Sequence, residues 1–462
     1  MTHTPRILSG LAASLALVLL SGARLAADTA SPGVIDWSKP NWLTDASLSI
    51  KESNDDNVLG VSGLGLTAVS SKVTDVGLKL GVSFVPLLGD QKTIQVLSLT
   101  YTPDFVTYQQ DSQENYNAHR LGAAVKAKSD NVSFSFDDAF LDVDGNKNAP
   151  TYALNQLAGA AGNQDDKYRN NYAHAVARER RAQTQDRYNL ALQLDEGSYF
   201  VRGVSSLVDY NLDTYLHNTG AAPYKGYQDY IDRYDVNGGL DLGYKILPDL
   251  ALTFGYRYGH QYQEQFAVAI NSDQHDATND YQRVLLGLEG KLASWLTIKA
   301  AAGPDIRSYG SAAPMVHDDT TRYYADGVLT ATIDPNQSVS LSYKKWIFVS
   351  STGLVPYIDT TLALTYHLNV TKELGLDVGG KLLEANYTMG DDVAGSAPDR
   401  RDDVDYGSTV GLTYAFTKQF SISANYQHDT GKNNLDGLAA NLFPAYRYFQ
   451  HEIISVGAQF KF

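Results

Sequence analysis

The sequence predicts an all-β fold, a transmembrane antiparallel β-barrel, and three observations indicate it. Segments of strand length alternate apolar and polar residues, so each strand has one apolar face and one polar face. Turns of two to four residues alternate with long polar loops, an asymmetry that is typical of bacterial outer-membrane barrels. The chain also ends on an amphipathic segment whose last residue, Phe462, is aromatic.

The amino terminus predicts an export signal. Arg6 supplies a positive charge, and residues 7–20 form an apolar run. This run is shorter than the roughly 20 residues of a membrane-spanning helix. Small residues follow, and we expect cleavage after Ala27, with Ala23 as the alternative. The predicted organisation is a signal peptide at 1–27, a periplasmic amino-terminal segment at 28–43 and a barrel at 44–462.

The composition limits the possible classes of protein. The chain contains no cysteine, which excludes disulfides and thiolate–metal sites. Its 31 tyrosines suit membrane–water interfaces, where an apolar ring and a hydrated hydroxyl are both favoured. The mean hydropathy of −0.27 is compatible with a barrel, because only alternate residues face lipid. A net charge of −15 argues against nucleic acid as a partner.

Counting the alternating segments gives eighteen strands. An even number leaves both ends of the barrel on the periplasmic side. Sixteen strands is the alternative, because the segment 44–85 is difficult to divide. The predicted strands are 44–53, 74–85, 92–109, 115–128, 131–143, 184–195, 198–212, 229–247, 249–265, 280–292, 294–309, 320–333, 337–350, 357–369, 373–388, 403–416, 418–430 and 446–462.

The polar faces of the strands predict a water-filled lumen. In the strand 249–265, Phe254 and Tyr256 share one face and Arg257 lies on the other. A charged side chain facing the middle of a bilayer costs about 2–4 kcal/mol, so such charges must point inward. Barrels of this size leave an aqueous channel. The residues predicted to face the lumen are Asp241, Lys245, Arg257, Arg283, Glu289 and Lys299.

The longest loop, 144–183, is the third long outer loop and is a candidate for a constriction inside the lumen. We expect a short helix at about 167–183. Charges of both signs across a constriction set ion preference. Alternatively, this is a surface loop whose arginines contact lipopolysaccharide phosphates or water. The candidate constriction residues are Asp165, Asp166, Arg169, Arg178, Arg180 and Arg181.

Three segments carry a resemblance to a known family. They are 49–58, which contains Asp-Asp-Asn, 281–288 followed by Trp295, and 302–309. They resemble the outer-membrane β-barrel porin group called β-barrel porin 2. The resemblance covers most of the mature chain and implies a porin-like barrel. It implies no known substrate and no catalytic residues.

The last strand predicts how the protein enters its membrane. Phe460 and Phe462 lie on its apolar face. This ending resembles the terminal strand of outer-membrane barrels, whose final aromatic residue is read by the barrel-assembly machinery; the alternative is the edge strand of a soluble β protein. The expected partners are outer-membrane lipid and lipopolysaccharide, the assembly machinery and small hydrophilic solutes. A homo-oligomer is left open, and nucleic acid is not expected.

No catalytic, metal or cofactor site is predicted. The ten histidines show no metal-ligand spacing, and no nucleophile elbow, phosphate-binding loop or zincin motif is present. Asp55-Asp56 and Asp402-Asp403 are interpreted as solvated loop charges. The sequence therefore predicts a non-enzymatic channel for passive diffusion of small hydrophilic solutes. The alternatives are a barrel component of polysaccharide export, another structural or assembly role in the outer membrane, and a lipase-like barrel enzyme.

Overall fold

The structure of the protein is a computed structural model. It describes residues 40–58, 68–88, 92–147, 181–213, 232–263, 277–309, 320–349, 356–386, 401–435 and 449–462. The predicted signal peptide, most of the predicted periplasmic segment and most of the predicted constriction loop lie outside these ranges. None of the helices in these ranges has the length and apolar character needed to cross a membrane.

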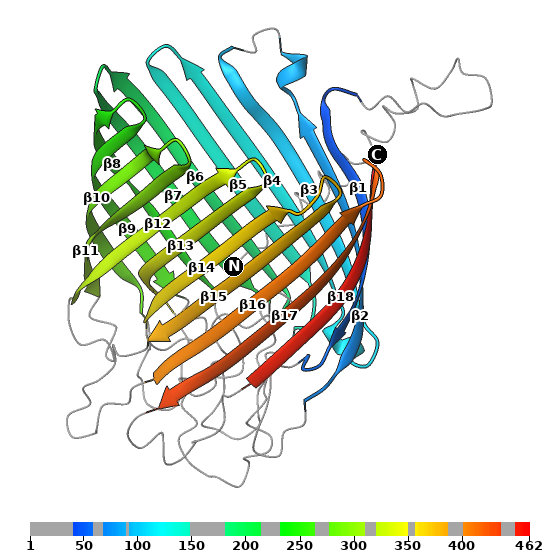
Figure 1. The fold of residues 1–462 in the computed structure, drawn as a ribbon. Helices are drawn as coiled ribbons and strands as arrows, with labels where there is room; N and C mark the ends of the chain where they lie inside the picture. The colour runs from blue at the N-terminus through cyan, green and yellow to red at the C-terminus, as the bar shows by residue number, and fades with distance from the viewer. Residues whose placement is uncertain are drawn as a thin grey trace, which may run out of the picture. The chain divides into compact units, whose positions relative to one another are not determined.

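Eighteen strands run through the described residues, and each is antiparallel to its neighbours (Figure 1). Two short 3₁₀ turns, η1 (Val85–Leu87) and η2 (Ser112–Glu114), lie on either side of β3 in the sequence. The strands are β1 (Leu43–Asp55), β2 (Ser71–Ser83), β3 (Ile94–Tyr108), β4 (Tyr116–Ser129), β5 (Val132–Asp144), β6 (Gln183–Glu196), β7 (Tyr199–Leu212), β8 (Arg233–Leu247), β9 (Leu250–Gln263), β10 (Asn279–Ala293), β11 (Leu296–Tyr309), β12 (Thr320–Asp334), β13 (Gln337–Phe348), β14 (Tyr357–Asn369), β15 (Leu374–Asn386), β16 (Arg401–Ala415), β17 (Phe420–Leu435) and β18 (Phe449–Lys461).

The strands close into a barrel. Each strand pairs with the next one in the sequence. The first strand also pairs with the last, from Ser47 opposite Lys461 to Asp55 opposite Ile453. Closure leaves no edge strand with unpaired backbone groups. The predicted antiparallel barrel of eighteen strands is therefore confirmed, and the alternative of sixteen strands is excluded.

One strand boundary differs clearly from its prediction. The segment 418–430 was expected to end at 430, whereas β17 continues to Leu435. The additional residues include Gly431 and Lys432, which pair with Asp405 and Val404 of β16. These residues lack an apolar alternation, so hydrogen bonding to the neighbouring strand extends β17 where the sequence pattern gives no signal.

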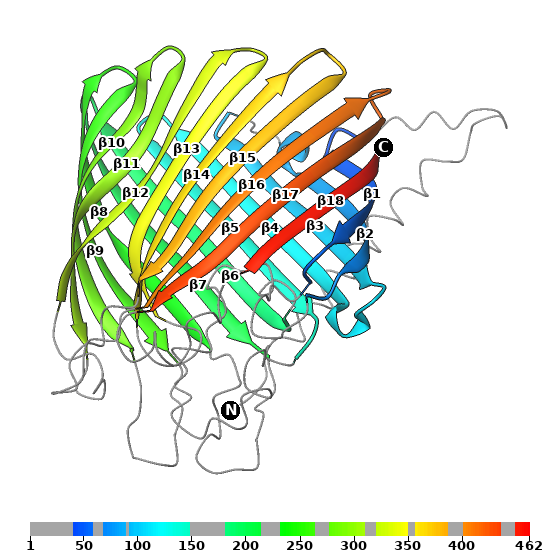
Figure 2. The ribbon, with the colours of Figure 1, turned by 60° about the horizontal axis from the view of Figure 1, so that its bottom comes forward.

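The short turns between strands lie at one end of the barrel, where β18 also ends (Figure 2). Residues 248–249, 294–295 and 335–336 form three of these turns. Gly197, in the turn between β6 and β7, has a φ of 60°. This left-handed conformation costs glycine little, because it has no Cβ atom. Proline, asparagine and glycine therefore mark the turns for backbone reasons.

The two faces of the wall have opposite chemistry. Large apolar side chains on the outer face are exposed, among them Leu240 at 59% and Phe254 at 54%. Charged side chains on the inner face are buried, among them Asp305 at 1% exposure and Arg307 at 0%. A soluble protein shows the reverse arrangement, since it buries its apolar residues. The alternation in each strand thus separates an apolar exterior from a polar interior.

Candidate functional site

A cavity of about 760 Å³ lies inside the barrel, and residues from β3 to β13 line it. Five of the six residues predicted to face the lumen lie on its wall. The exception is Lys245, which pairs with Asp195 at 2.8 Å near the turn end of β8. The five residues that the structure brings together are Asp241, Arg257, Arg283, Glu289 and Lys299.

The charge of this cavity wall differs from that of the whole chain. Basic side chains outnumber acidic ones on the wall, although the protein carries a net charge of −15. The field inside the cavity is therefore more positive than the overall charge suggests. The basic residues on the wall are Lys126, Lys128, Arg202, Arg257, Arg283, Lys299 and Lys344, and the acidic residues are Asp137, Asp235, Asp241, Glu289 and Asp326.

Several of these charges form a connected cluster on the wall. Arg202 of β7 lies 3.0 Å from Asp241 and 2.8 Å from Glu289. Arg257 of β9 lies 2.7 Å from the other oxygen of Asp241. Asp241 shares its register position with Gly255, and a Cβ atom there would crowd the Asp241 carboxylate. The glycine thus leaves room for the carboxylate to lie between two arginines.

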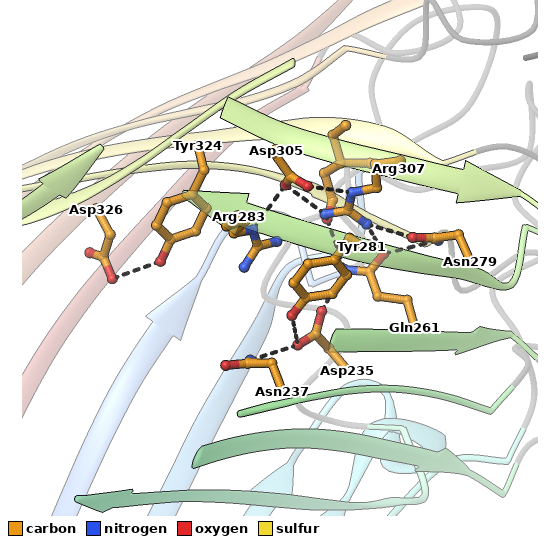
Figure 3. A network of polar contacts seen from close by, with 11 residues as sticks. Asp235, Asn237, Gln261, Asn279, Tyr281, Arg283, Asp305, Arg307, Tyr324 and Asp326 are labelled. Carbon is orange, nitrogen blue, oxygen red and sulfur yellow. Dashed lines mark hydrogen bonds and ion pairs between the residues drawn. The ribbon is translucent and has the colours of Figure 1, made fainter. Parts of the chain in front are cut away.

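A second network joins the ends of β8, β9, β10 and β11 that lie away from the short turns. Figure 3 shows its side chains. At its centre Arg307 uses all five N–H donors of its guanidinium group. Two of them bind Asp305, at 2.9 Å each. The others bind Gln261 at 2.8 Å, Asn279 at 2.9 Å and the backbone carbonyl of Ile347 at 3.0 Å. A fully satisfied guanidinium of this kind is a rigid part of the lumen.

Tyr281 joins β10 to β8 across β9. Its hydroxyl donates a hydrogen bond to Asp235 at 2.8 Å. The residue opposite Tyr281 on β9 is Gly259, and a Cβ atom at that position would overlap the tyrosine ring. The ring therefore crosses β9 only because position 259 is glycine. Gln261 also donates to Asp235, at 2.6 Å, so both carboxylate oxygens are hydrogen-bonded.

The end of β13 separates from β12, although it stays paired with β14 up to Phe348, opposite Tyr357. The pairing of β13 with β12 stops at Lys345, opposite Ala325, although β12 begins at Thr320. The carbonyl of Ile347 accepts a hydrogen bond from Gln261 of β9 at 2.9 Å. Neighbouring strands are about 4.8 Å apart, so a β13 that stayed in the wall would lie about 19 Å along it from β9. A glutamine cannot span that distance, and the strand end must therefore turn inward.

Other contacts hold this strand end inside the barrel. The carbonyl of Val349 accepts a hydrogen bond from Arg233 of β8 at 2.6 Å. The guanidinium carbon of Arg233 also lies 4.5 Å from the ring centre of Phe348. Ile347, Phe348 and Val349 are each at most 3% exposed. The inward end of β13 therefore narrows the lumen. The predicted constriction by the loop 144–183 stays a prediction, since most of that loop lies outside the described residues.

The residues predicted for that loop constriction are mostly outside the described ranges: Asp165, Asp166, Arg169, Arg178 and Arg180. Arg181 is described and is 2% exposed. Its Nη1 atom lies 3.0 Å from a carboxylate oxygen of Glu114 in η2. Arg181 is not among the residues that line the cavity. It belongs to a buried ion pair at the beginning of β6.

The interpretation of Asp55 as a solvated loop charge is wrong. Asp55 is the last residue of β1 and is 3% exposed. Its Oδ1 atom lies 2.8 Å from Nε2 of His451 on β18 and accepts a hydrogen bond from the backbone N–H of Asn57. One ligand atom each from Asp55, Asp56 and His451 lie within 4.8 Å of one another. Asp55 therefore forms a buried polar contact between the first and last strands.

Sequence reasoning missed several residues of the second network, although a signal for some was present. Asp305 and Arg307 share the inward face of β11 with Lys299, which was predicted to face the lumen. The period of two therefore could have identified them. The inward turn at Ile347 has no comparable signal, because it depends on hydrogen bonds from strands distant in sequence.

Comparisons with known proteins show similarity at the level of solved barrel structures. No protein-family model and no curated protein sequence matches this chain. OccAB4 of Acinetobacter baumannii is 12% identical, with 92% of this chain and 100% of that chain covered and a TM-score of 0.39. The outer-membrane protein OpdK of Pseudomonas aeruginosa is 11% identical, with coverage of 90% and 99% and a TM-score of 0.39.

The siderophore receptor PirA of Acinetobacter baumannii is 8% identical, with 90% of this chain and 80% of that chain covered and a TM-score of 0.41. All three TM-scores are below 0.5. We therefore derive the function from the residues of this barrel. The resemblance to β-barrel porin 2 rests on the quoted segments, and the barrel that it implied is present.

The packing of Tyr281 over Gly259 gives a first test. We expect Gly259→Ala to destabilise the refolded protein by about 1–3 kcal/mol, because the displaced ring leaves Asp235 without its tyrosine donor. Urea unfolding measures this change. The matched control is Gly380→Ala, where the added Cβ atom meets nothing within 4 Å. Equal destabilisation by the two variants would contradict the proposed role of Gly259.

Proposed function

We propose that this protein is a channel of the bacterial outer membrane for passive diffusion of small hydrophilic solutes. The observation that carries the proposal is the reversed chemistry of the closed wall, with apolar side chains outside and a charged cavity inside. A closed barrel satisfies every backbone polar group of its strands internally, which the lipid core requires. The lumen then supplies water and fixed polar groups along the path of a solute.

Aromatic residues near the short turns support a position in a membrane. Tyr199 and Tyr244 lie with ring centres 5.0 Å apart, and Phe460 and Phe462 with ring centres 4.9 Å apart. Trp295, in one of the short turns, is 51% exposed. Aromatic side chains gather at membrane–water interfaces because they combine an apolar body with polar or polarisable groups. These residues would form the periplasmic aromatic belt.

The proposal includes the route to the membrane. Export would use the signal peptide at 1–27, and the barrel-assembly machinery would read the last strand through Phe460 and Phe462. Both aromatic side chains lie on the outer face, at 40% and 52% exposure. Lipid would cover the outer wall, and lipopolysaccharide would contact the end with the long loops. The proposed transport involves no catalytic step and no cofactor.

The mechanism combines a size limit with a charge preference. The inward end of β13 and the cavity wall limit the size of a solute that can pass. The excess of basic over acidic side chains on that wall favours anions. Many wall charges are already paired, as Arg202 is with Asp241, so this preference is modest. Solutes exchange part of their hydration shell for the fixed polar groups of the lumen.

Planar-bilayer recording of the refolded chain 28–462 tests the function directly. We expect stepwise single-channel currents, because one continuous aqueous lumen opens with each insertion. Liposomes that contain the protein should swell in small sugars and progressively less in larger ones. A heat-denatured sample is the control. Absence of both currents and swelling from a correctly refolded barrel would refute the channel.

A matched pair of lysine substitutions tests which face of the wall meets lipid. Leu364 lies on the outer face in the middle of β14 and is 47% exposed, and Thr365 lies beside it on the inner face. We expect Leu364→Lys to destabilise the barrel by about 2–4 kcal/mol, because a lysine at mid-bilayer loses its hydration. Thr365→Lys should change little. Urea unfolding in phospholipid vesicles measures both, and a larger effect at position 365 would reverse the assignment.

Ion selectivity tests the charge of the cavity. We expect the reversal potential in a KCl gradient to indicate a preference for chloride. Lys299→Glu should lower the chloride-to-potassium permeability ratio by about twofold, since it replaces a cavity cation by an anion. Lys245→Glu makes the same change outside the cavity, next to Asp195. The two variants should therefore differ, and identical shifts would disconnect selectivity from this cavity.

A further inference from the structure

Arg283 is held in a fixed orientation on the cavity wall. Its Nε atom donates a hydrogen bond to Asp305 at 3.0 Å. The guanidinium carbon lies 4.0 Å from the ring centre of Tyr281 and 4.3 Å from that of Tyr324, so the cation sits between two aromatic rings. The side chain is 5% exposed. These contacts together fix the plane in which the guanidinium group lies.

One end of this guanidinium group is unsatisfied. Among the described residues, Nη2 of Arg283 has no hydrogen-bond partner. Figure 3 shows the terminal nitrogens directed away from the Asp305 carboxylate that holds Nε. A buried donor without a partner costs about 1–3 kcal/mol, and the fixed plane prevents it from turning back to Asp305. Because Arg283 lines the cavity, an acceptor that enters with a small shift of the side chain can satisfy this buried donor.

A second cation and two aromatic rings lie on the same wall. Lys344 of β13 lines the cavity, close enough to Arg283 for the two positive charges to repel each other. Its Nζ atom lies 3.9 Å from the ring centre of Trp346, and it forms no ion pair within the part of the chain that the structure describes. Tyr324 and Trp346 add aromatic surface to the wall. Two cations and two rings therefore face a common space.

Three acidic residues, Asp235, Asp326 and Asp359, interact with Lys344, and the first two are also on the cavity wall. Asp235 accepts hydrogen bonds from Tyr281 and Gln261 on its two oxygens, which disperses its charge. Asp326 accepts one from the Tyr324 hydroxyl at 3.3 Å and is exposed. Asp326 therefore is the group that would repel an anion bound near Arg283.

We propose that Arg283 and Lys344 form a subsite in the lumen for small carboxylates that carry a flat apolar body. A carboxylate offers two coplanar oxygens, one for Nη2 of Arg283 and one for the Lys344 ammonium group. The flat body packs against the edges of the Tyr324 and Trp346 rings, whose faces meet Arg283, Lys344 and Phe348. The inference rests on the proposed function, since a solute reaches this wall through an open lumen. It adds a solute class to the channel.

Current block by benzoate tests the subsite. We expect benzoate to interrupt single-channel currents, and benzamide and acetate to need an about tenfold higher concentration, because each lacks half of the recognised chemistry. Arg283→Gln and Lys344→Gln should each raise the half-blocking concentration of benzoate by about tenfold. Asp326→Asn should lower it, because it removes the opposing charge.

Lys299→Gln is the matched control, since it removes one positive charge from the same cavity. Lys299 lies on β11 six residues from Asp305, which is opposite Arg283. The variant should leave the half-blocking concentration within about twofold of the parent value. Equal block by benzoate and benzamide would overturn the inference. So would a Lys299→Gln variant that weakens block as much as the subsite variants do. Neither result would contradict the proposed channel function.

Fluorescence separates this inference from the proposed function. Nitrobenzoate absorbs light and should quench Trp346 in the refolded barrel, with a saturable loss that Trp346→Phe removes and Lys344→Gln shifts to about tenfold higher concentration. This titration needs no ion current. Quenching without conductance would support the subsite and refute the channel. Conductance without saturable quenching of Trp346 would refute the subsite.

Discussion

The structure depends on one requirement, that every strand finds a partner on both sides. The pairing of β1 with β18 meets it for the whole wall, because it removes the last two edges. Only a closed sheet can present an apolar exterior without exposing backbone N–H and C=O groups to it. Once the sheet is closed, the period of two along each strand assigns every side chain to the outside or the inside.

Confinement inside the cylinder then decides how the charges arrange themselves. Inward side chains of neighbouring strands lie close together. Charged side chains therefore share ion pairs, as Asp241 does with Arg202 and Arg257. Glycines on the inner face extend the reach of these contacts. Lys381 crosses Gly407 to pair with Asp429 at 3.0 Å, just as Tyr281 crosses Gly259. Ion pairs and hydrogen bonds between strands therefore fix the side chains of the lumen around a defined cavity.

Periodicity in the sequence was sufficient for the strand number and the facing of residues such as Asp241 and Arg257. These properties are local, since alternation along one strand determines them. The inward turn of β13 at Ile347 could not be predicted, because it arises where side chains of three other strands meet two backbone carbonyls. Asp55 was misread for a similar reason: its partner, His451, is nearly a whole chain length away.

The contact between Asp55 and His451 forms late in folding, because it joins the first strand to the last. These residues are 396 positions apart, so the seam has the highest contact order in the wall. Loop-closure entropy delays such distant pairings until shorter-range ones have formed. Neighbouring hairpins can pair early, whereas the first and last strands pair only after all the other strands have paired. A sheet with two open edges is prone to aggregate, so the pairing of β1 with β18 also ends the period in which the chain exposes unpaired strand edges.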